Sequence, residues 1–271
     1  MITKIISGNV IERRKSRITR RPVKRGGRIR GNSSEKKIEG NKRAAILALS
    51  RVLNVNFHRG DLLLTLTFDP AHLDACGGTL EGAKREAKKF LDRVSYRLKK
   101  AGKTCKWIVV PSEIDGETGK LVRPHVHLVI SGDGFSWKEG KLFLLDEEVE
   151  AKIWRQGTVD NRPLRRQDDY YGLAKYLVDQ ARNVPDEKKW SCSRNMEKPI
   201  IRREIVTSGR QLRVPTGAVE LPGTCYDPER DQNVVRYVAK PKEARTKLGG
   251  HKELARAMAA EAATGGEDDG I

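Results

Sequence analysis

Two histidines separated by one residue are the most informative feature of the chain, in the tripeptide His125-Val126-His127. Alternate residues of a β-strand point to the same face, so a strand here would present both imidazoles on one side. The apolar residues between and after them would face the core: Val126, Leu128 and Ile130. Two neighbouring imidazoles make a good platform for a divalent cation. The alternative is a pair of histidines that face solvent on an edge strand.

A third metal ligand is expected from the segment that precedes the histidines. KWIVVPSE at 106–113 has the composition of a strand, and the DG and TG pairs that follow are turn signals. A hairpin would bring Glu113 back beside the histidine strand. Mg²⁺ and Mn²⁺ favour carboxylate oxygen, so Glu113 is the expected third ligand. Asp115 and Glu117, within the turn, are second choices.

A helix predicted over 168–183 carries the candidate nucleophile. Its apolar stripe includes Tyr170, which we expect in the core, whereas Tyr171 and Lys175 lie at the edge of the stripe or beyond it. Tyr176 falls on the polar face. A phenol can act as a covalent nucleophile, and its free pKa of about 10 means that it needs assistance at pH 7. The alternative is that Tyr176 is an ordinary residue at the boundary of an amphipathic helix.

The surrounding segments predict an α+β fold. Strands are expected at 62–68, 106–113 and 125–132, and helices at 80–100, 147–154 and 168–183, with further strands at 200–206 and 233–239. Strand, helix, hairpin, helix is the order of a central antiparallel sheet covered by helices on one face. The other face of such a sheet is free for a ligand.

The distribution of charge divides the chain. Of 271 residues, 54 are Lys or Arg and 36 are Asp or Glu, a net charge of +18 that suits a nucleic-acid partner. Much of the excess lies in residues 1–45, which we expect to be a disordered basic arm that binds phosphates or only solubilises the chain. Residues 46–200 form the predicted central domain. Residues 201–271 are expected to be a C-terminal extension with an acidic tail.

Composition also excludes several classes of protein. No apolar run approaches the roughly 20 residues of a membrane helix. The four cysteines contain no CxxC pair, which argues against a zinc finger or a disulfide framework. We therefore expect reduced thiols and a cytoplasmic protein. No phosphate-binding GxxxxGK[ST] motif is present, so DNA unwinding would need a partner.

Three motifs, in order, resemble those of the HUH endonucleases: LTLTF at 64–68, PHVHLVI at 124–130 and LAKYL at 173–177. They are most similar to the rolling-circle replication initiators, or Rep proteins, of small plasmids and single-stranded DNA phages. Further segments resemble phage gene II-type replication-associated proteins: WIVVPSE, IWRQGTV and KKWSCSRNMEKP. The resemblance covers about residues 60–200 and implies an RRM-like sheet in a bacterial, plasmid- or phage-encoded protein.

The resemblance implies a metal-dependent strand transfer. In such a family Mg²⁺ or Mn²⁺ polarises a phosphodiester of single-stranded origin DNA, and a tyrosine attacks it to give a 5′-phosphotyrosine and a free 3′-OH. Carried over, His125 and His127 are ligands with Glu113 as the third, Tyr176 is the nucleophile and Lys175 its motif lysine. Thr65 and Thr67 belong to a structural motif. A host helicase and polymerase are the implied partners.

Positive residues between the histidines and the tyrosine helix are expected to contact DNA: Arg155, Arg162, Arg165 and Arg166. Trp154 could stack a base, although we favour a core position for it. One departure from the family is Gly172, where many relatives have Tyr or Glu one turn before the tyrosine. Tyr171 is therefore the backup nucleophile, and termination would need another group or a second protomer.

Other function classes remain open. The first is a relaxase or transposase of the HUH type, although the order of motifs, with the tyrosine after the histidines, argues against a relaxase. The second is a non-catalytic basic DNA-binding protein with the same fold. The third is an RNA-binding or ribosome-associated protein, suggested by the basic arm alone.

Overall fold

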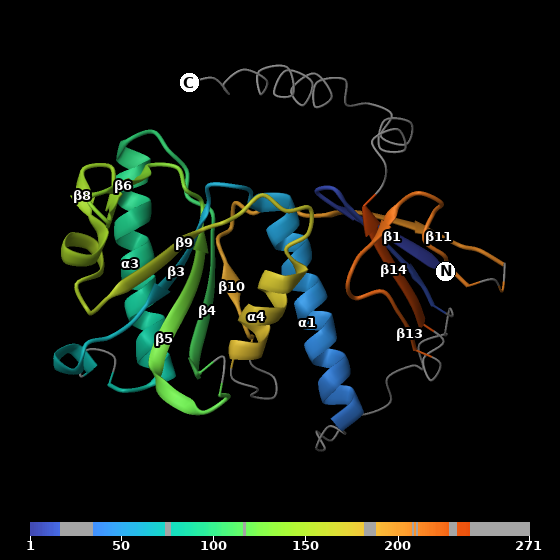
Figure 1. The fold of residues 1–271 in the computed structure, drawn as a ribbon, viewed down its shortest axis with the longest axis horizontal. Coiled ribbons are helices and arrows are strands. Elements are labelled where there is room, and N and C mark those ends of the chain that lie inside the picture. Colours follow the sequence, from blue (N-terminus) through green and yellow to red (C-terminus); the bar gives the residue numbers. More distant parts are fainter. Residues whose placement is uncertain are drawn as a thin grey trace, which may run out of the picture. The chain divides into compact units, whose positions relative to one another are not determined.

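The computed structural model describes residues 1–16, 35–73, 77–115, 118–181, 188–207, 209, 211–227 and 232–238 (Figure 1). The chain divides into two compact units. One contains a five-stranded sheet with three long helices, and the other a six-stranded sheet. This arrangement of antiparallel sheets and helices confirms the predicted α+β class. Within the described residues no helix is long and apolar enough to cross a bilayer.

The five-stranded sheet has the order β10-β4-β5-β3-β9, and every neighbouring pair is antiparallel. Its strands are β3 (Leu62–Leu66), β4 (Trp107–Ile114), β5 (Leu121–Ile130), β9 (Val159–Pro163) and β10 (Ser191–Cys192). β4 and β5 form the predicted hairpin, and β5 is the central strand. The histidine pair therefore lies in the middle of a sheet and not on an edge strand.

Helix α3 (Leu80–Lys100) covers one face of this sheet. It begins where the Thr79 side chain accepts a hydrogen bond of 3.1 Å from the backbone N–H of Gly82. The predicted helix over 80–100 is confirmed, and its apolar residues are buried against the strands: Ala83, Ala87, Phe90, Leu91, Val94 and Leu98. A short 3₁₀ turn, η1 (Pro70–His72), lies between β3 and α3.

The second face of the sheet is covered by α1 (Glu35–Asn56) and α4 (Tyr171–Gln180) (Figure 1). Apolar residues of both helices pack on Ile108, Val110 and Val129. The expectation of helices on one face is therefore wrong. The physical reason is visible in β4 and β5, where consecutive residues are apolar, a pattern that requires burial on both faces.

A small three-stranded sheet and a π-helix follow β5. The sheet has the order β6-β7-β8, with β6 at Phe135–Lys138, β7 at Lys141–Leu144 and β8 at Glu147–Glu148. The helix η2 spans Val149–Trp154. The segment 147–154, predicted to be one short helix, is thus divided between a strand and a π-turn. Trp154 is fully buried against Phe68 and Phe90, which confirms its core position.

The six-stranded sheet joins both ends of the chain. Its order is β11-β1-β2-β14-β12, and β13 pairs with β14. Its strands are β1 (Ile2–Ser7), β2 (Val10–Lys15), β11 (Ile200–Glu204), β12 (Val219–Glu220), β13 (Cys225–Asp227) and β14 (Gln232–Val238). The strands expected near 200–206 and 233–239 are β11 and β14.

The expected disordered arm over 1–45 needs correction. β1, β2 and the start of α1 give regular structure to residues 2–7, 10–15 and 35–45, whereas 17–34 lie outside the described residues. The physical reason is long-range pairing, since β2 runs antiparallel to β14, with Val10 opposite Val238. The acidic tail over 261–271 also lies outside the described residues.

Candidate active site

The histidine pair is fixed by the register of three strands. His127 lies opposite Thr65 of β3 and Val110 of β4, and His125 lies opposite Ser112. Both imidazoles project from the face that α4 covers, because the residues of opposite orientation are buried under α3: Val126, Leu128 and Ile130. The predicted alternation is confirmed. The histidines share one face above an apolar core.

The two imidazoles converge through their Nε2 atoms. The separation of these atoms is 3.2 Å, and the rings lie at 90° with centroids 4.9 Å apart. Two adjacent ligands, each about 2.1 Å from an octahedral cation, stand about 3 Å from one another. The spacing of the Nε2 atoms therefore fits two ligands of one divalent ion.

A buried amide completes the convergence. Oε1 of Gln180, at the C-terminal end of α4, lies 3.2 Å from Nε2 of His127. Its backbone oxygen accepts a hydrogen bond of 2.7 Å from Oγ of Ser112, which anchors the end of α4 to β4. Gln180 is 4% exposed. Imidazole nitrogen is a typical ligand of transition-metal ions and an amide oxygen one of Mg²⁺ or Mn²⁺, so this mixed donor set is a candidate site for a divalent cation.

His127 is prepared for metal binding by its surroundings. Burial, together with the neighbouring His125, lowers its pKa to about 4, so the imidazole is neutral at pH 7. Nδ1 of His127 lies 3.3 Å from Oγ1 of Thr65. In the tautomer that carries hydrogen on Nδ1, Thr65 accepts that hydrogen and the Nε2 lone pair is directed toward His125 and Gln180.

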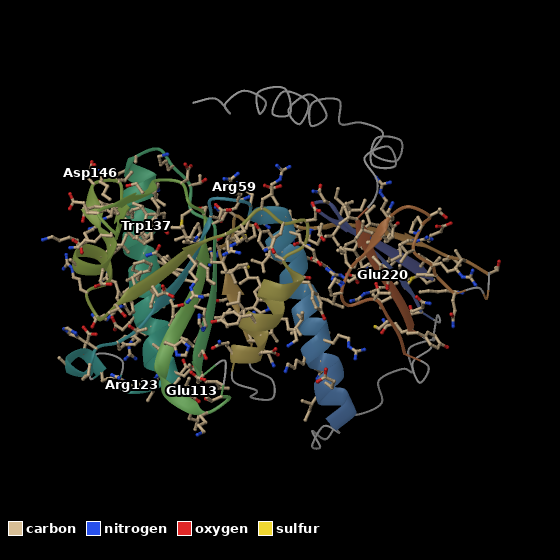
Figure 2. All side chains as sticks on the ribbon, in the orientation of Figure 1. Arg59, Glu113, Arg123, Trp137, Asp146 and Glu220 are labelled. Carbon is tan, nitrogen blue, oxygen red and sulfur yellow. The ribbon has the colours of Figure 1, made fainter. Side chains whose placement is uncertain are left out.

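Glu113, the expected third ligand, does not join the histidines. The pairing of β4 with β5 is irregular between Ser112 and Ile114, so Ser112 and not Glu113 stands opposite His125. Glu113 lies toward the hairpin end of β4, as does Arg123 on β5 (Figure 2). The part of the chain that the structure describes contains no group of three His, Cys, Asp or Glu residues placed to hold a metal ion.

The two second-choice ligands are also accounted for. The carboxylate of Asp115 accepts hydrogen bonds from the backbone N–H and the hydroxyl of Thr118, at 2.7 and 2.8 Å, and so stabilises the hairpin turn. Glu117 lies outside the described residues. Sequence reasoning did not identify Gln180 as a candidate ligand. The available signal was its position four residues after Tyr176, on the same side of the helix.

Tyr176 lies beside the histidine pair. Its ring centroid is 5.5 Å from that of His127, and the residue is 43% exposed, so the phenol is open to a substrate. Burial is the largest cause of a raised pKa at Tyr176. Arg162 lowers that pKa, whereas Asp160 and Asp115 raise it. At neutral pH the phenol is therefore protonated and needs electrostatic help to act as a nucleophile.

The other two tyrosines of this helix face the core. Tyr170 is 3% exposed, which confirms its predicted core position. Tyr171, the backup nucleophile, is half-buried and packs against the apolar residues beneath α1 and α4. A Cβ atom added to Gly172 would meet nothing within 4 Å. The surface of α4 is therefore open at Gly172, one turn before Tyr176.

Lys175 is engaged by another residue of α4. Its Nζ atom lies 2.5 Å from Oδ2 of Asp179, and this hydrogen bond raises the pKa of Lys175. Nζ of Lys42, on α1, lies 2.7 Å from the other carboxylate oxygen of Asp179. Asp179 thus takes one of the three N–H donors of Lys175 and offsets part of its charge.

The predicted DNA-contacting arginines fall in different places. Arg162, on β9, is exposed and pairs with Asp160 at 3.4 Å, and its charge acts on Tyr176. Arg165 and Arg166 are exposed in the segment that follows β9. Arg155 ends η2, and its charge acts on Arg93 of α3, so it belongs to the other face of the sheet.

The segment from β3 to the end of α4 carries the whole candidate site. Residues 61–181 match the family model of the replication-associated proteins of the ORF2 and gene II protein type. The match supports a role in the initiation of DNA replication, and it includes both histidines, Tyr176 and Gln180. It covers somewhat less than half of the chain. Comparisons with curated proteins and with solved structures found no match.

Proposed function

We propose that this protein nicks and rejoins single-stranded DNA through a 5′-phosphotyrosine at Tyr176, and that this reaction initiates rolling-circle replication. The observation that carries the proposal is the contact between the exposed Tyr176 ring and His127. The Nε2 atom of His127 lies close to Nε2 of His125 and to Oε1 of Gln180. The match to replication-associated proteins supports DNA as the substrate. The net charge of +18 supports a polyanionic partner.

Mg²⁺ or Mn²⁺, when bound, would stabilise charge on the oxygens of the scissile phosphate. His125, His127 and Gln180 are the residues that would hold it. Thr65 orients the imidazole of His127 from the other side. None of these three residues is a carboxylate, so all three ligands would be neutral. They would not offset the positive charge of the ion, which would attract the negatively charged phosphate.

The chemistry at Tyr176 is a transesterification. Its Oη atom attacks phosphorus, a Tyr O–P bond forms and the P–O3′ bond breaks. The phenol loses one proton to solvent and the departing 3′-oxygen gains one, so the step is balanced and needs no external energy source. Attack of the 3′-OH on the same phosphorus reverses the reaction and rejoins the strand. The cationic side chain of Arg162 is near enough to influence Tyr176 and would attract the phosphate.

The competing proposal is a DNA-binding protein of the same fold without catalysis. Two observations favour it: Glu113 does not join the histidines, and Lys175 is paired with Asp179. It predicts that Tyr176→Phe and His125→Ala leave DNA function intact. An HUH-type relaxase or transposase would share the chemistry and differ only in the DNA that it processes.

A covalent-adduct assay tests the proposal. The probe is a pool of single-stranded DNA with a randomised 40-nucleotide region, labelled at the 3′ end because a 5′-phosphotyrosine retains the downstream fragment. Wild type, Tyr176→Phe and Tyr171→Phe are incubated with Mn²⁺ or EDTA and separated on a denaturing gel. We expect a slow-migrating adduct that needs Mn²⁺ and is absent only in Tyr176→Phe. If the adduct is absent only in Tyr171→Phe, the nucleophile is Tyr171 instead. If wild-type protein binds the DNA tightly but forms no adduct, the result would support the competing proposal of a DNA-binding protein without catalysis.

A further inference from the structure

A second candidate site, bordered by lysines, lies on the face of the five-stranded sheet that α3 covers, opposite the histidines. It is a cavity of about 470 Å³ lined by α3, β4 and the segment that leads into β10. Its β4 residues are Trp107, Val109 and Pro111, which alternate with the residues opposite the histidines. At β4 the sheet therefore lies between the cavity and Tyr176, whereas Lys188, Trp190 and Ser191 border the cavity at the β10 edge of the sheet.

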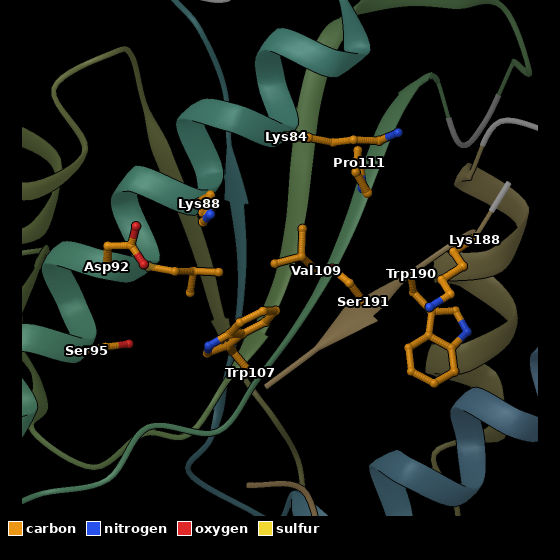
Figure 3. Close-up of a pocket in the computed structure, with 11 residues that line it drawn as sticks. Lys84, Lys88, Asp92, Ser95, Trp107, Val109, Pro111, Lys188, Trp190 and Ser191 are labelled. Atoms are coloured by element: carbon orange, nitrogen blue, oxygen red, sulfur yellow. The ribbon is translucent and has the colours of Figure 1, made fainter. Parts of the chain in front are cut away.

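Two indoles line this cavity (Figure 3). Trp107 packs against the core beneath α3, and Trp190 packs against the core beneath α1 and α4. Both side chains are half-buried. Each indole is thus held by packing on one side and still borders the cavity. Fixed aromatic faces of this kind are the platforms on which bases of single-stranded nucleic acids stack.

Three lysines border the same cavity. Lys84 and Lys88 project from α3, and Lys188 lies beside Trp190 (Figure 3). Glu81 pairs with Lys84 at 2.6 Å and offsets part of its charge. Asp92 and Ser95 also line the cavity and offer hydrogen-bond acceptors. Ammonium groups suit phosphate, and the carboxylate of Asp92 suits an amino group of a base.

We propose that this cavity binds a nucleotide, with its base against Trp107 and Trp190 and its phosphate on Lys84, Lys88 and Lys188. The combination decides the ligand class. Lysines alone would suit any anion, and indoles alone any apolar group, whereas a flat ring joined to a phosphate uses both. The volume falls within the range of pockets that enclose small ligands. The nucleotide is either a unit of single-stranded DNA or a free nucleotide. The site does not depend on the nicking chemistry.

Photocrosslinking and binding together test the site. The full chain carries Tyr176→Phe, so that no covalent adduct forms by nicking. A 12-nucleotide oligothymidylate containing 5-iodouracil is irradiated on the protein, and the crosslinked peptides are identified by mass spectrometry. We expect crosslinks at Trp107 or Trp190. Crosslinks confined to other segments would overturn the proposal.

Matched substitutions separate this site from general electrostatics. Lys88→Glu should weaken binding of fluorescein-labelled oligothymidylate about tenfold. Lys99→Glu, an exposed lysine on the same helix that does not line the cavity, changes the net charge equally and should weaken binding by less than about threefold. Equal effects of the two substitutions would contradict a built site.

A second pair of variants tests stacking. Trp190→Leu should weaken binding about tenfold and Trp190→Phe should restore most of it, because the aromatic face is what the base needs. Trp137→Leu removes an exposed indole from another hairpin and should have little effect. Circular dichroism melting of each variant verifies folding. A folded Trp190→Leu protein with unchanged affinity would contradict stacking at this site.

Competition distinguishes the two sources of the nucleotide. If micromolar oligothymidylate binds and only millimolar thymidine monophosphate displaces it from the crosslink, the strand is the natural ligand. Displacement by micromolar thymidine monophosphate would assign the site to a free nucleotide. If neither oligothymidylate nor thymidine monophosphate protects Trp107 and Trp190 from crosslinking, the assignment of a nucleotide to this cavity is overturned.

Discussion

Nε2 of His127 and Oε1 of Gln180 lie 3.2 Å apart, although 53 residues separate them in the chain. The contact joins the middle strand of the sheet to the last turn of α4. The hydroxyl of Ser112, on the adjacent strand, donates a hydrogen bond to the backbone oxygen of Gln180 and so anchors the C-terminal end of α4 to the sheet. The same helix places Tyr176 one turn earlier, beside His127. One strand and one helix therefore bring together the candidate metal ligands and the candidate nucleophile.

Gln180→Leu should lower the affinity for Mn²⁺ at least about tenfold, because it removes one of three converging donors. Gln180→Glu should retain or strengthen binding, since a carboxylate oxygen replaces the amide oxygen. Isothermal titration calorimetry with MnCl₂ measures both. Gln167→Leu, at an exposed position before the start of α4, is the control and should bind like wild type. Unchanged affinity in Gln180→Leu would remove Gln180 from the ligand set.

Thr65→Val should weaken Mn²⁺ binding about tenfold and lower the free energy of unfolding by about 1–2 kcal/mol, because Nδ1 of buried His127 loses its partner. Thr65→Ser keeps the hydroxyl and should recover most of both quantities. Urea denaturation and manganese titration provide the two readouts. If Thr65→Val and Thr65→Ser have the same manganese affinity and the same free energy of unfolding, the hydroxyl does not orient the imidazole.

Gly172→Ala should raise the free energy of unfolding by about 0.5–1 kcal/mol. The added methyl group meets nothing within 4 Å, and alanine favours the helical conformation. Adduct formation should stay within about twofold of wild type, since one methyl group leaves most of the open space. Thermal denaturation and the adduct assay measure these effects. A marked loss of adduct would mean that the site requires glycine itself.

The reactivity of Cys105 should depend steeply on pH. Burial raises its pKa to about 11, so at pH 8 the folded protein holds little thiolate. Alkylation of Cys105 by iodoacetamide should accelerate about tenfold for each pH unit between 8 and 10, because the thiolate is the nucleophile. Mass spectrometry of the peptide that contains Cys105 follows the reaction. Alkylation at pH 8 as fast in the folded protein as in urea would contradict the burial of this thiol.

The sequence predicted the elements whose patterns are local. Helix α3 begins and ends at the predicted residues, since its apolar residues recur every three or four positions and Thr79 provides a cap. The alternation around His125 and His127 likewise located their common face. Tyr170 was correctly assigned to the core from its angular position on the helix.

Features that depend on distant partners were not predictable. β2 is half lysine and arginine, and it forms a strand because it pairs with β14, which lies more than 200 residues later in the chain. Glu113 was misplaced because an irregularity in the β4–β5 pairing leaves Ser112 opposite His125. Gln180 was overlooked because an amide is a weaker sequence signal for a metal site than histidine or a carboxylate.

The most direct measurement of the central claim is the identity of the residue that carries DNA. The manganese-dependent adduct is trimmed with nuclease to a single nucleotide and digested with trypsin. Cleavage after Lys175 separates Tyr176 from Tyr170 and Tyr171, so the peptide that contains residues 176–182 reports on Tyr176 alone. We predict a nucleotide 5′-monophosphate linked to Tyr176. A nucleotide on the peptide of residues 167–175, or an unmodified digest from DNA-bound wild-type protein, would contradict the account.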